Sequence, residues 1–126
     1  MAENQKTLPI YTTKGDLEAY LIYPHLYNRQ GEWIGYITSE RHVYSVHGHY
    51  VGWLSDGPRV LRKMADSFDR GRIRVQRPSA LKIRPPAISP LAPLMAELAF
   101  GIVDVLQDQP ELLPPVDFGD GLEDMD

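Results

Sequence analysis

A short motif that occurs three times between residues 9 and 54 constrains the fold more than any other feature. Each copy consists of an aliphatic–tyrosine pair, a polar turn that contains glycine, and a second apolar run. The copies begin at Ile10-Tyr11, Leu26-Tyr27 and Val43-Tyr44, so the tyrosine advances by 16 and then 17 residues. A fixed short period predicts one supersecondary unit used repeatedly, and no such unit buries its apolar face alone.

Each copy has the pattern of a β-hairpin. The turn glycines are Gly15, Gly31 and Gly48. A short hairpin loop needs a residue at positive φ, which glycine adopts without steric cost. The position four residues after each glycine holds a small residue, which is Ala19, Gly35 or Gly52. A small residue between large ones predicts that another backbone or ring approaches closely.

A large aromatic residue follows each of these small residues, namely Tyr20, Tyr36 and Trp53. We expect these rings to be buried near an axis that the hairpins share, with their polar atoms hydrogen-bonded. Core packing is the favoured role for them. Stacking against a small ligand is the alternative, and the three aromatics are therefore the candidate ligand-binding residues.

The repeated motif resembles the bacterial four-fold β-flower domain. The matching residues are Tyr11, Gly15, Tyr20, Tyr27, Gly31, Gly35, Tyr36, Tyr44, Gly48, Gly52 and Trp53. The resemblance covers roughly the first 55 to 75 residues of the chain. It implies small β-hairpins arranged around a pseudo-four-fold axis, and it implies no particular activity.

The fourth copy departs from this pattern. It should begin at Val60-Leu61, but no glycine stands at the expected turn position near Ala65. We expect the segment 69–75, which contains Gly71, to supply the turn and the return strand after an insertion. The fourth hairpin is therefore predicted to be longer than the others, or irregular.

At 126 residues the chain is expected to form one domain that buries about two thirds of its unfolded surface. The predicted fold class is all-β, with tandem β-hairpins around a pseudo-four-fold axis, a proline-rich arm and one C-terminal amphipathic helix. The predicted segments are a frayed N-terminus at 1–8, the hairpin repeat at 9–77, the arm at 78–93, the helix at 90–107 and an acidic tail at 108–126.

The predicted helix begins with Ser89 as its cap and Pro90 in its first turn. Apolar residues recur within it at spacings of three and four, which places them on one face. Five of them are the candidate partner-binding residues: Leu91, Leu94, Leu98, Ile102 and Val105. Such a face must be covered, and the alternatives are this chain's own domain, a second copy and another protein.

Charge is segregated along the chain. Nine of the 13 basic residues lie between residues 59 and 84, whereas nine acidic residues and no basic ones lie from residue 97 onward. The candidate basic patch is Arg70, Arg72, Arg74 and Arg77, of which the first three alternate as on one face of a strand. These arginines could protect an edge strand, pair with the acidic tail, or bind nucleic acid. The net charge of −4 makes nucleic acid the least favoured of the three.

Few residues of the sequence suggest a catalytic or metal-binding site. The chain has no cysteine, which excludes disulfides and thiolate metal sites. His47 and His49 resemble a metal-binding pair, but the other copies have Lys14, Gln30, Asp16 and Glu32 at the matching positions. We therefore expect ordinary polar turn positions there, no metal and no cofactor. Phosphate-binding and dinucleotide-binding loops and nucleophile elbows are also absent, so no enzymatic activity is expected.

These patterns favour a non-catalytic protein-interaction or scaffold module whose partner is another protein or a second copy of itself. The first alternative is a small-ligand-binding protein that uses the three aromatics. The second is a nucleic-acid-associated protein that uses the basic segment 59–84. Residues 1–6 do not resemble a signal peptide, and no run approaches the roughly 18 apolar residues of a membrane span. We expect a cytoplasmic protein with no membrane partner.

Overall fold

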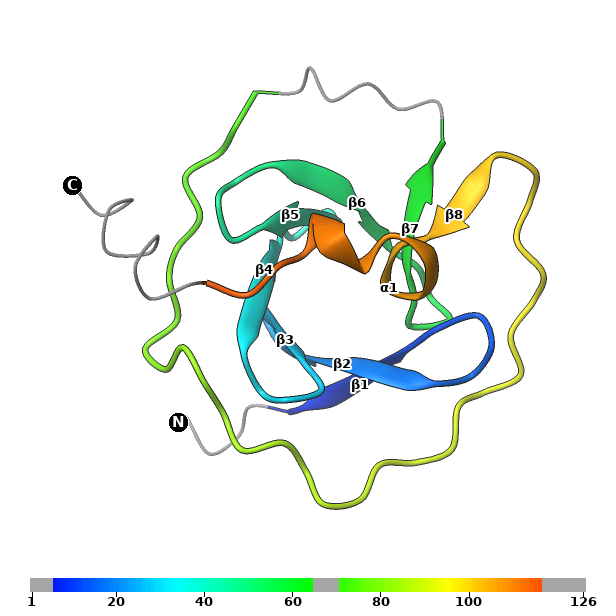
Figure 1. Cartoon of the computed structure of the whole chain (residues 1–126), viewed down its shortest axis with the longest axis horizontal. Helices are drawn as coiled ribbons and strands as arrows, with labels where there is room; N and C mark the ends of the chain where they lie inside the picture. The colour runs from blue at the N-terminus through cyan, green and yellow to red at the C-terminus, as the bar shows by residue number, and fades with distance from the viewer. Residues whose placement is uncertain (1–5, 65–70, 117–126) are drawn as a thin grey trace.

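The computed structural model describes residues 6–64 and 71–116. Within these residues, eight strands form one antiparallel sheet in which each strand pairs with the next along the chain (Figure 1). The strands are β1 (Leu8–Tyr11), β2 (Leu17–Ile22), β3 (His25–Asn28), β4 (Trp33–Ile37), β5 (His42–Ser45), β6 (Tyr50–Leu54), β7 (Val60–Lys63) and β8 (Ile102–Asp104). They make four consecutive hairpins, numbered 1 to 4 in chain order. The predicted all-β class is confirmed.

The turns of hairpins 1 to 3 have the predicted construction. Their glycines have φ values of 94°, 85° and 88°, a region that favours glycine. Each turn opens with a side-chain oxygen that accepts a hydrogen bond from the backbone N–H four residues later. The three acceptors are Thr12, Asn28 and Ser45. The same short sequence therefore closes three hairpins in the same way.

The core lies on the inner face of the curled sheet. The aliphatic residue before each tyrosine position is at most 1% exposed in all four hairpins: Ile10, Leu26, Val43 and Val60. The predicted close approach is confirmed at two of the three small positions, Gly35 and Gly52. A Cβ on Gly35 would lie 2.9 Å from the carbonyl oxygen of Tyr44, and a Cβ on Gly52 would lie 1.9 Å from that of Leu61. Glycine thus allows each hairpin to curl tightly against the next.

The fourth hairpin is completed by a strand far along the chain. Strand β7 pairs with β8, with Leu61 opposite Asp104, and its turn glycine is Gly101 at φ 85°. The prediction that segment 69–75 returns as the second strand is wrong. Residues 69 and 70 lie outside the described residues, and 71–75 form no strand. The chain instead goes around the molecule before it returns to β7.

Residues 71–100, here called the belt, run around the outside of the hairpins (Figure 1). The belt passes the turns of hairpins 3, 2 and 1 in that order and then reaches β8. Backbone hydrogen bonds tie it to the turns of hairpins 3 and 2, from Ile73 N to Gly48 O and from Ile83 N to Gly31 O. The proline-rich arm expected at 78–93 lies inside this belt and is extended.

The helix predicted over 90–107 is wrong in its bounds. Helix α1 covers only Val105–Asp108, and a short 3₁₀ turn, η2, follows at Pro110–Leu112. Residues 88–99 form neither a helix nor a strand, and residue 100 begins the turn of hairpin 4. In residues 88–99 a half-buried position recurs every third residue among exposed ones, which is the period of a polyproline helix. Apolar residues three apart fit this period as well as that of an α-helix, and Pro90 and Pro93 favour the extended form.

The short helix and the residues after it pack on the core. Val105, Leu106 and Leu113 belong to the same hydrophobic cluster as the hairpin aliphatics. In Figure 1, α1 and the orange segment after it lie over the middle of the ring of hairpins. In the described part of the chain, no helix is both long enough and apolar enough to cross a membrane.

Candidate functional site

The belt contacts successive hairpins with a spacing of ten residues. Ile73 donates to the turn of hairpin 3 over 3.0 Å, and Ile83 donates to that of hairpin 2 over 2.8 Å. The hydroxyl of Tyr27 donates to Ala80 O over 3.1 Å, and the hydroxyl of the matching Tyr11 donates to Pro90 O. The belt is therefore a second repeat, matched to the first.

A sequence signal for this second repeat exists and was missed. Arg72-Ile73-Arg74 recurs ten residues later as Lys82-Ile83-Arg84, and Ser79 and Leu81 recur as Ser89 and Leu91. The repeat is short and lies among prolines, which suggested only an unpaired arm. Its ten-residue period has meaning only once the distance between neighbouring hairpin turns is known.

The two tyrosines that hold the belt are buried beneath it. Tyr11 and Tyr27 are each 3% exposed. Burial raises the pKa of Tyr11 above its ordinary value, and the nearby Tyr20 raises it further. Burial also raises the pKa of Tyr27. Both phenols therefore stay protonated and keep donating to the belt well above neutral pH.

The outer side of the belt carries a row of large apolar side chains, here called the ridge. Its members are Ile88, Leu91, Leu94 and Phe100, which are 88% to 105% exposed. The positions that follow three of them, Ser89, Ala92 and Met95, are half-buried against the hairpins. The prolines and the period of three thus turn Ile88, Leu91 and Leu94 outward, and Phe100 is exposed in the turn of hairpin 4.

The five predicted partner-binding residues do not share one face. Leu91 and Leu94 lie on the ridge, where they are almost completely exposed. Leu98 is half-buried on the inner side of the belt, Ile102 lies in β8, and Val105 is fully buried in the core. The helical face that was expected to unite them does not form, because residues 90–101 are not helical.

A groove of about 470 Å³ lies between the belt and hairpin 1. Apolar residues dominate its walls, among them Leu8, Tyr11, Pro58, Leu91 and Pro93. Arg41 and Asp56 also line it, with 3.8 Å between the Arg41 Nη2 and Asp56 Oδ1 atoms. Leu91 belongs both to this groove and to the ridge, so an apolar recess and an apolar projection adjoin one another.

The three candidate ligand-binding aromatics do not converge on an axis, so that part of the expectation is wrong, although Tyr20 is buried as expected, at 4% exposed. Tyr20 lies between Ala19 and Leu21, which both face the core, and a strand alternates its faces. The Tyr36 ring instead lies 5.8 Å from the His25 ring, and Trp53 borders a shallow hollow beside Arg41. The centre of the ring of hairpins is filled by aliphatic side chains.

The basic segment serves several different purposes. Arg59 and Arg62 are 8% and 3% exposed and donate to backbone oxygens, so they are structural. Arg72 donates from Nε and Nη2 to the His47 carbonyl, which fastens the start of the belt. Arg74 and Arg77 are exposed on the belt, and Arg70 lies outside the described residues. The predicted strand face of alternating arginines does not form.

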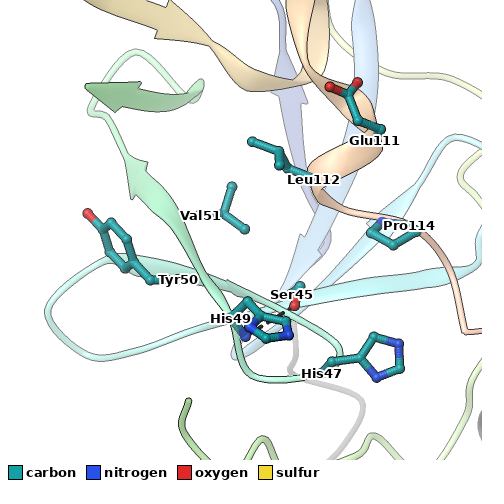
Figure 2. Close-up of a pocket in the computed structure, with 8 residues that line it drawn as sticks. All are labelled: Ser45, His47, His49, Tyr50, Val51, Glu111, Leu112 and Pro114. Carbon is teal, nitrogen blue, oxygen red and sulfur yellow. Dashed lines mark hydrogen bonds between the residues drawn. The ribbon is translucent and has the colours of Figure 1, made fainter. Parts of the chain in front are cut away.

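A second cavity, of about 270 Å³, lies at the turn of hairpin 3 (Figure 2). Its lining combines Ser45, His47, His49 and Glu111 with apolar residues such as Leu112. The Ser45 hydroxyl accepts from the His49 backbone N–H, as the matching turn residues do in hairpins 1 and 2. Among the described residues, no three His, Cys, Asp or Glu side chains are grouped so that they could hold a metal ion.

A protein-family model described as "4-fold beta flower protein" matches residues 8–99. The match covers the three regular hairpins and nearly the whole belt. No curated protein and no solved structure matches the chain. The three repeated hairpins, the fourth hairpin that completes them and this match lead to one conclusion: the chain belongs to the 4-fold beta flower family.

Proposed function

We propose that this protein is a non-catalytic interaction module that associates with a second copy of itself through the ridge and the adjoining groove. The observation that carries the proposal is the exposure of Ile88, Leu91, Leu94 and Phe100, which range from 88% to 105%. Full burial of one such side chain stabilises a protein or complex by about 1.5–3 kcal/mol. Four of them on one belt supply a strong drive for association.

The ridge is held in place before any partner arrives. Pro90 and Pro93 restrict the backbone between its members. Arg59 donates to Ala96 O over 2.9 Å, and Tyr11 donates to Pro90 O, so both halves of this stretch are attached to the hairpins. Association therefore loses little conformational entropy, which favours affinity.

A second copy is the partner that these surfaces fit. In a two-fold dimer the same patch occurs on both subunits, so the patch must be complementary to itself. The ridge projects, and the groove of about 470 Å³ beside it is a recess of the same apolar character. Leu91 borders both, which allows the ridge of each copy to enter the groove of the other.

The test is the solution mass of the full chain, measured by light scattering over a range of concentrations. The wild type should be a dimer, and the double variant Leu91→Asp/Leu94→Asp should be a monomer. The matched control is Ser79→Asp/Ala80→Asp, which adds the same charge at exposed belt positions away from the ridge; it should remain a dimer. A wild type that is monomeric at every concentration overturns the proposal, as does a ridge variant that still dimerises.

A further inference from the structure

At hairpin 2 the belt pairs with the turn as a short antiparallel bridge. Trp33 N donates to Leu81 O over 2.9 Å, and Ile83 N donates to Gly31 O over 2.8 Å. Glu32 and Lys82 are the residues directly opposite one another. An extended segment that adds to a sheet through backbone hydrogen bonds is a common mode of peptide recognition.

Hairpin 3 holds the belt with part of the same geometry. Ile73 N donates to Gly48 O over 3.0 Å. A Cβ on Gly48 would lie 2.0 Å from the Ile73 carbonyl oxygen, and a Cβ on Gly31 would lie 2.0 Å from that of Ile83. Both turns therefore accept an extended backbone in direct contact with the glycine, and an isoleucine supplies the N–H each time.

Hairpin 1 has the same turn but lacks the bridge. Its Gly15 has φ 94° and matches Gly31, and its Leu17 matches Trp33. By the ten-residue spacing, the belt residue that corresponds to Ile73 and Ile83 is Pro93, which has no N–H to donate. Within the described residues, no backbone hydrogen bond joins the belt to Gly15 or Leu17, whereas the belt makes two such bonds at hairpin 2. A Cβ on Gly15 would lie 3.8 Å from Ala92 Cβ, which is an ordinary van der Waals contact, so the belt passes this turn without the close backbone approach that it makes at Gly31.

We propose that the turn of hairpin 1 binds an extended peptide from another protein, in the way that the belt binds hairpin 2. The belt itself shows the kind of peptide that fits. It has a leucine-like residue, then a basic residue, then an aliphatic residue other than proline whose N–H reaches Gly15 O. Asp16 stands where hairpin 2 has Glu32, so a basic residue is favoured opposite it, as Lys82 is.

The surroundings of hairpin 1 suit such an occupant. The apolar side chains of Tyr11, Pro90 and Pro93, which also line the groove of about 470 Å³, lie on the belt side of this turn and offer contacts for the aliphatic side chain. The bound peptide displaces belt residues 90–93 outward. Those residues carry Leu91, so binding of the peptide should also disturb the ridge.

The probe is a synthetic peptide with the sequence of residues 79–84, Ser-Ala-Leu-Lys-Ile-Arg, with blocked ends. It is titrated into the isotopically labelled full chain while backbone amide signals are followed by NMR. The signals of Gly15 and Leu17 should shift with saturation. A control peptide with proline in place of isoleucine should bind at least about tenfold more weakly, because it lacks the donor. No shift at these two residues, shifts confined to Gly31 and Trp33, or equal binding of the control overturns the proposal.

A disulfide offers a second test, because the chain has no cysteine of its own. The Cβ separation of 3.8 Å between positions 15 and 92 is that of a native disulfide. In Gly15→Cys/Ala92→Cys, oxidation should fix the belt to the turn and abolish peptide binding, and reduction should restore it. Peptide binding that is the same in both forms contradicts the proposal.

Cysteine at position 15 is strained at positive φ, so a second variant guards against failure to fold. Pro93→Ile restores the missing N–H and should let the belt close its own bridge, which weakens peptide binding by at least about tenfold. Unchanged binding overturns the proposal. Because the peptide and the second copy would both act on residues 90–93, the titration is repeated with the variant Leu91→Asp/Leu94→Asp, which cannot form the proposed dimer. Absence of peptide shifts in that variant overturns this inference alone, whereas light scattering on the wild type tests the proposed dimer.

Discussion

Asp104 Oδ2 accepts two hydrogen bonds from Thr13, one from the backbone N–H over 2.6 Å and one from the hydroxyl over 2.7 Å. Asp104 ends β8 and Thr13 lies in the turn of hairpin 1, so the contact joins the two ends of the sheet. Arg59 Nη1 donates to the same Thr13 hydroxyl over 3.1 Å. One buried carboxylate thus connects the fourth hairpin to the first, which no strand pairing joins within the described residues.

Replacement of Asp104 should strongly destabilise the protein. The side chain is fully buried, and its Oδ1 also accepts from Gln107 N over 3.2 Å, which caps α1. Asp104→Ala leaves three part-buried donors, two on Thr13 and one on Gln107, without this acceptor. An unsatisfied donor costs about 1–3 kcal/mol when it is buried. We expect the free energy of unfolding in urea to fall by about 3 kcal/mol or more. The control Asp108→Ala, at an exposed position of the same helix, should change it by no more than about 0.5 kcal/mol. Similar losses in the two variants would refute the role of Asp104.

Alanine at the turn glycines should separate backbone strain from contact with the belt. Gly15 and Gly31 both have positive φ, but a Cβ at Gly31 would lie 2.0 Å from Ile83 O, whereas at Gly15 it would only touch Ala92. Gly15→Ala should cost about 1 kcal/mol of stability from strain alone. Gly31→Ala should cost about 3 kcal/mol or more, or detach the belt from hairpin 2. Gly101→Ala, with open space around it, is the control and should resemble Gly15→Ala. Equal losses at all three would show that the belt does not press on the turn.

Replacement of a glycine inside a strand by alanine should destabilise the protein. The loss of stability should be larger where the backbone of the next strand lies closer to the added Cβ. A Cβ at Gly52 would lie 1.9 Å from Leu61 O, and a Cβ at Gly35 would lie 2.9 Å from Tyr44 O. Backbone atoms cannot move aside as a flexible side chain does. Gly52→Ala should therefore lower the melting temperature more than Gly35→Ala. The reverse order would indicate that the strands separate more easily at hairpin 3.

The protein should lose stability in alkaline solution because of the two buried tyrosines. Burial raises the pKa of both Tyr11 and Tyr27 in the folded state, with the neighbouring Tyr20 adding to the rise at Tyr11. The unfolded chain therefore releases these protons first, and stability falls as the pH rises from about 10 toward the folded-state pKa values. Thermal melts from about pH 8 to pH 11 measure this fall.

The double variant Tyr11→Phe/Tyr27→Phe provides the matched control. At neutral pH it should lose about 1 kcal/mol for each hydrogen bond to the belt. Above pH 10 its melting temperature should fall less steeply than that of the wild type. An equally steep alkaline fall in both proteins would assign the effect to other groups.

The hairpins could be predicted because their information is local. Each of the first three has its turn glycine, its capping oxygen and its alternating apolar residues within about a dozen consecutive positions. The close approach at Gly35 and Gly52 was predictable for the same reason, since no other residue type leaves room for a neighbouring backbone. The three aromatics after these positions were placed on the wrong face, because the motif alone does not show which side of the strand faces the core.

Only the tertiary structure decided three features: the strand that pairs with β7, the path of residues 71–100, and the non-helical conformation of residues 90–101. Strand β8 follows Gly101, far from β7 in the sequence, and local preference cannot select between it and the nearer glycine at 71. The apolar residues from 88 to 100 fit a helix and an extended chain equally well. Attachment of the belt to the hairpin turns decides for the extended form, because Tyr11 and Arg59 bind carbonyl oxygens that a helix would use internally. The repeat thus determined the unit of this fold, and contacts between distant segments determined how the units are joined and which apolar residues reach the surface.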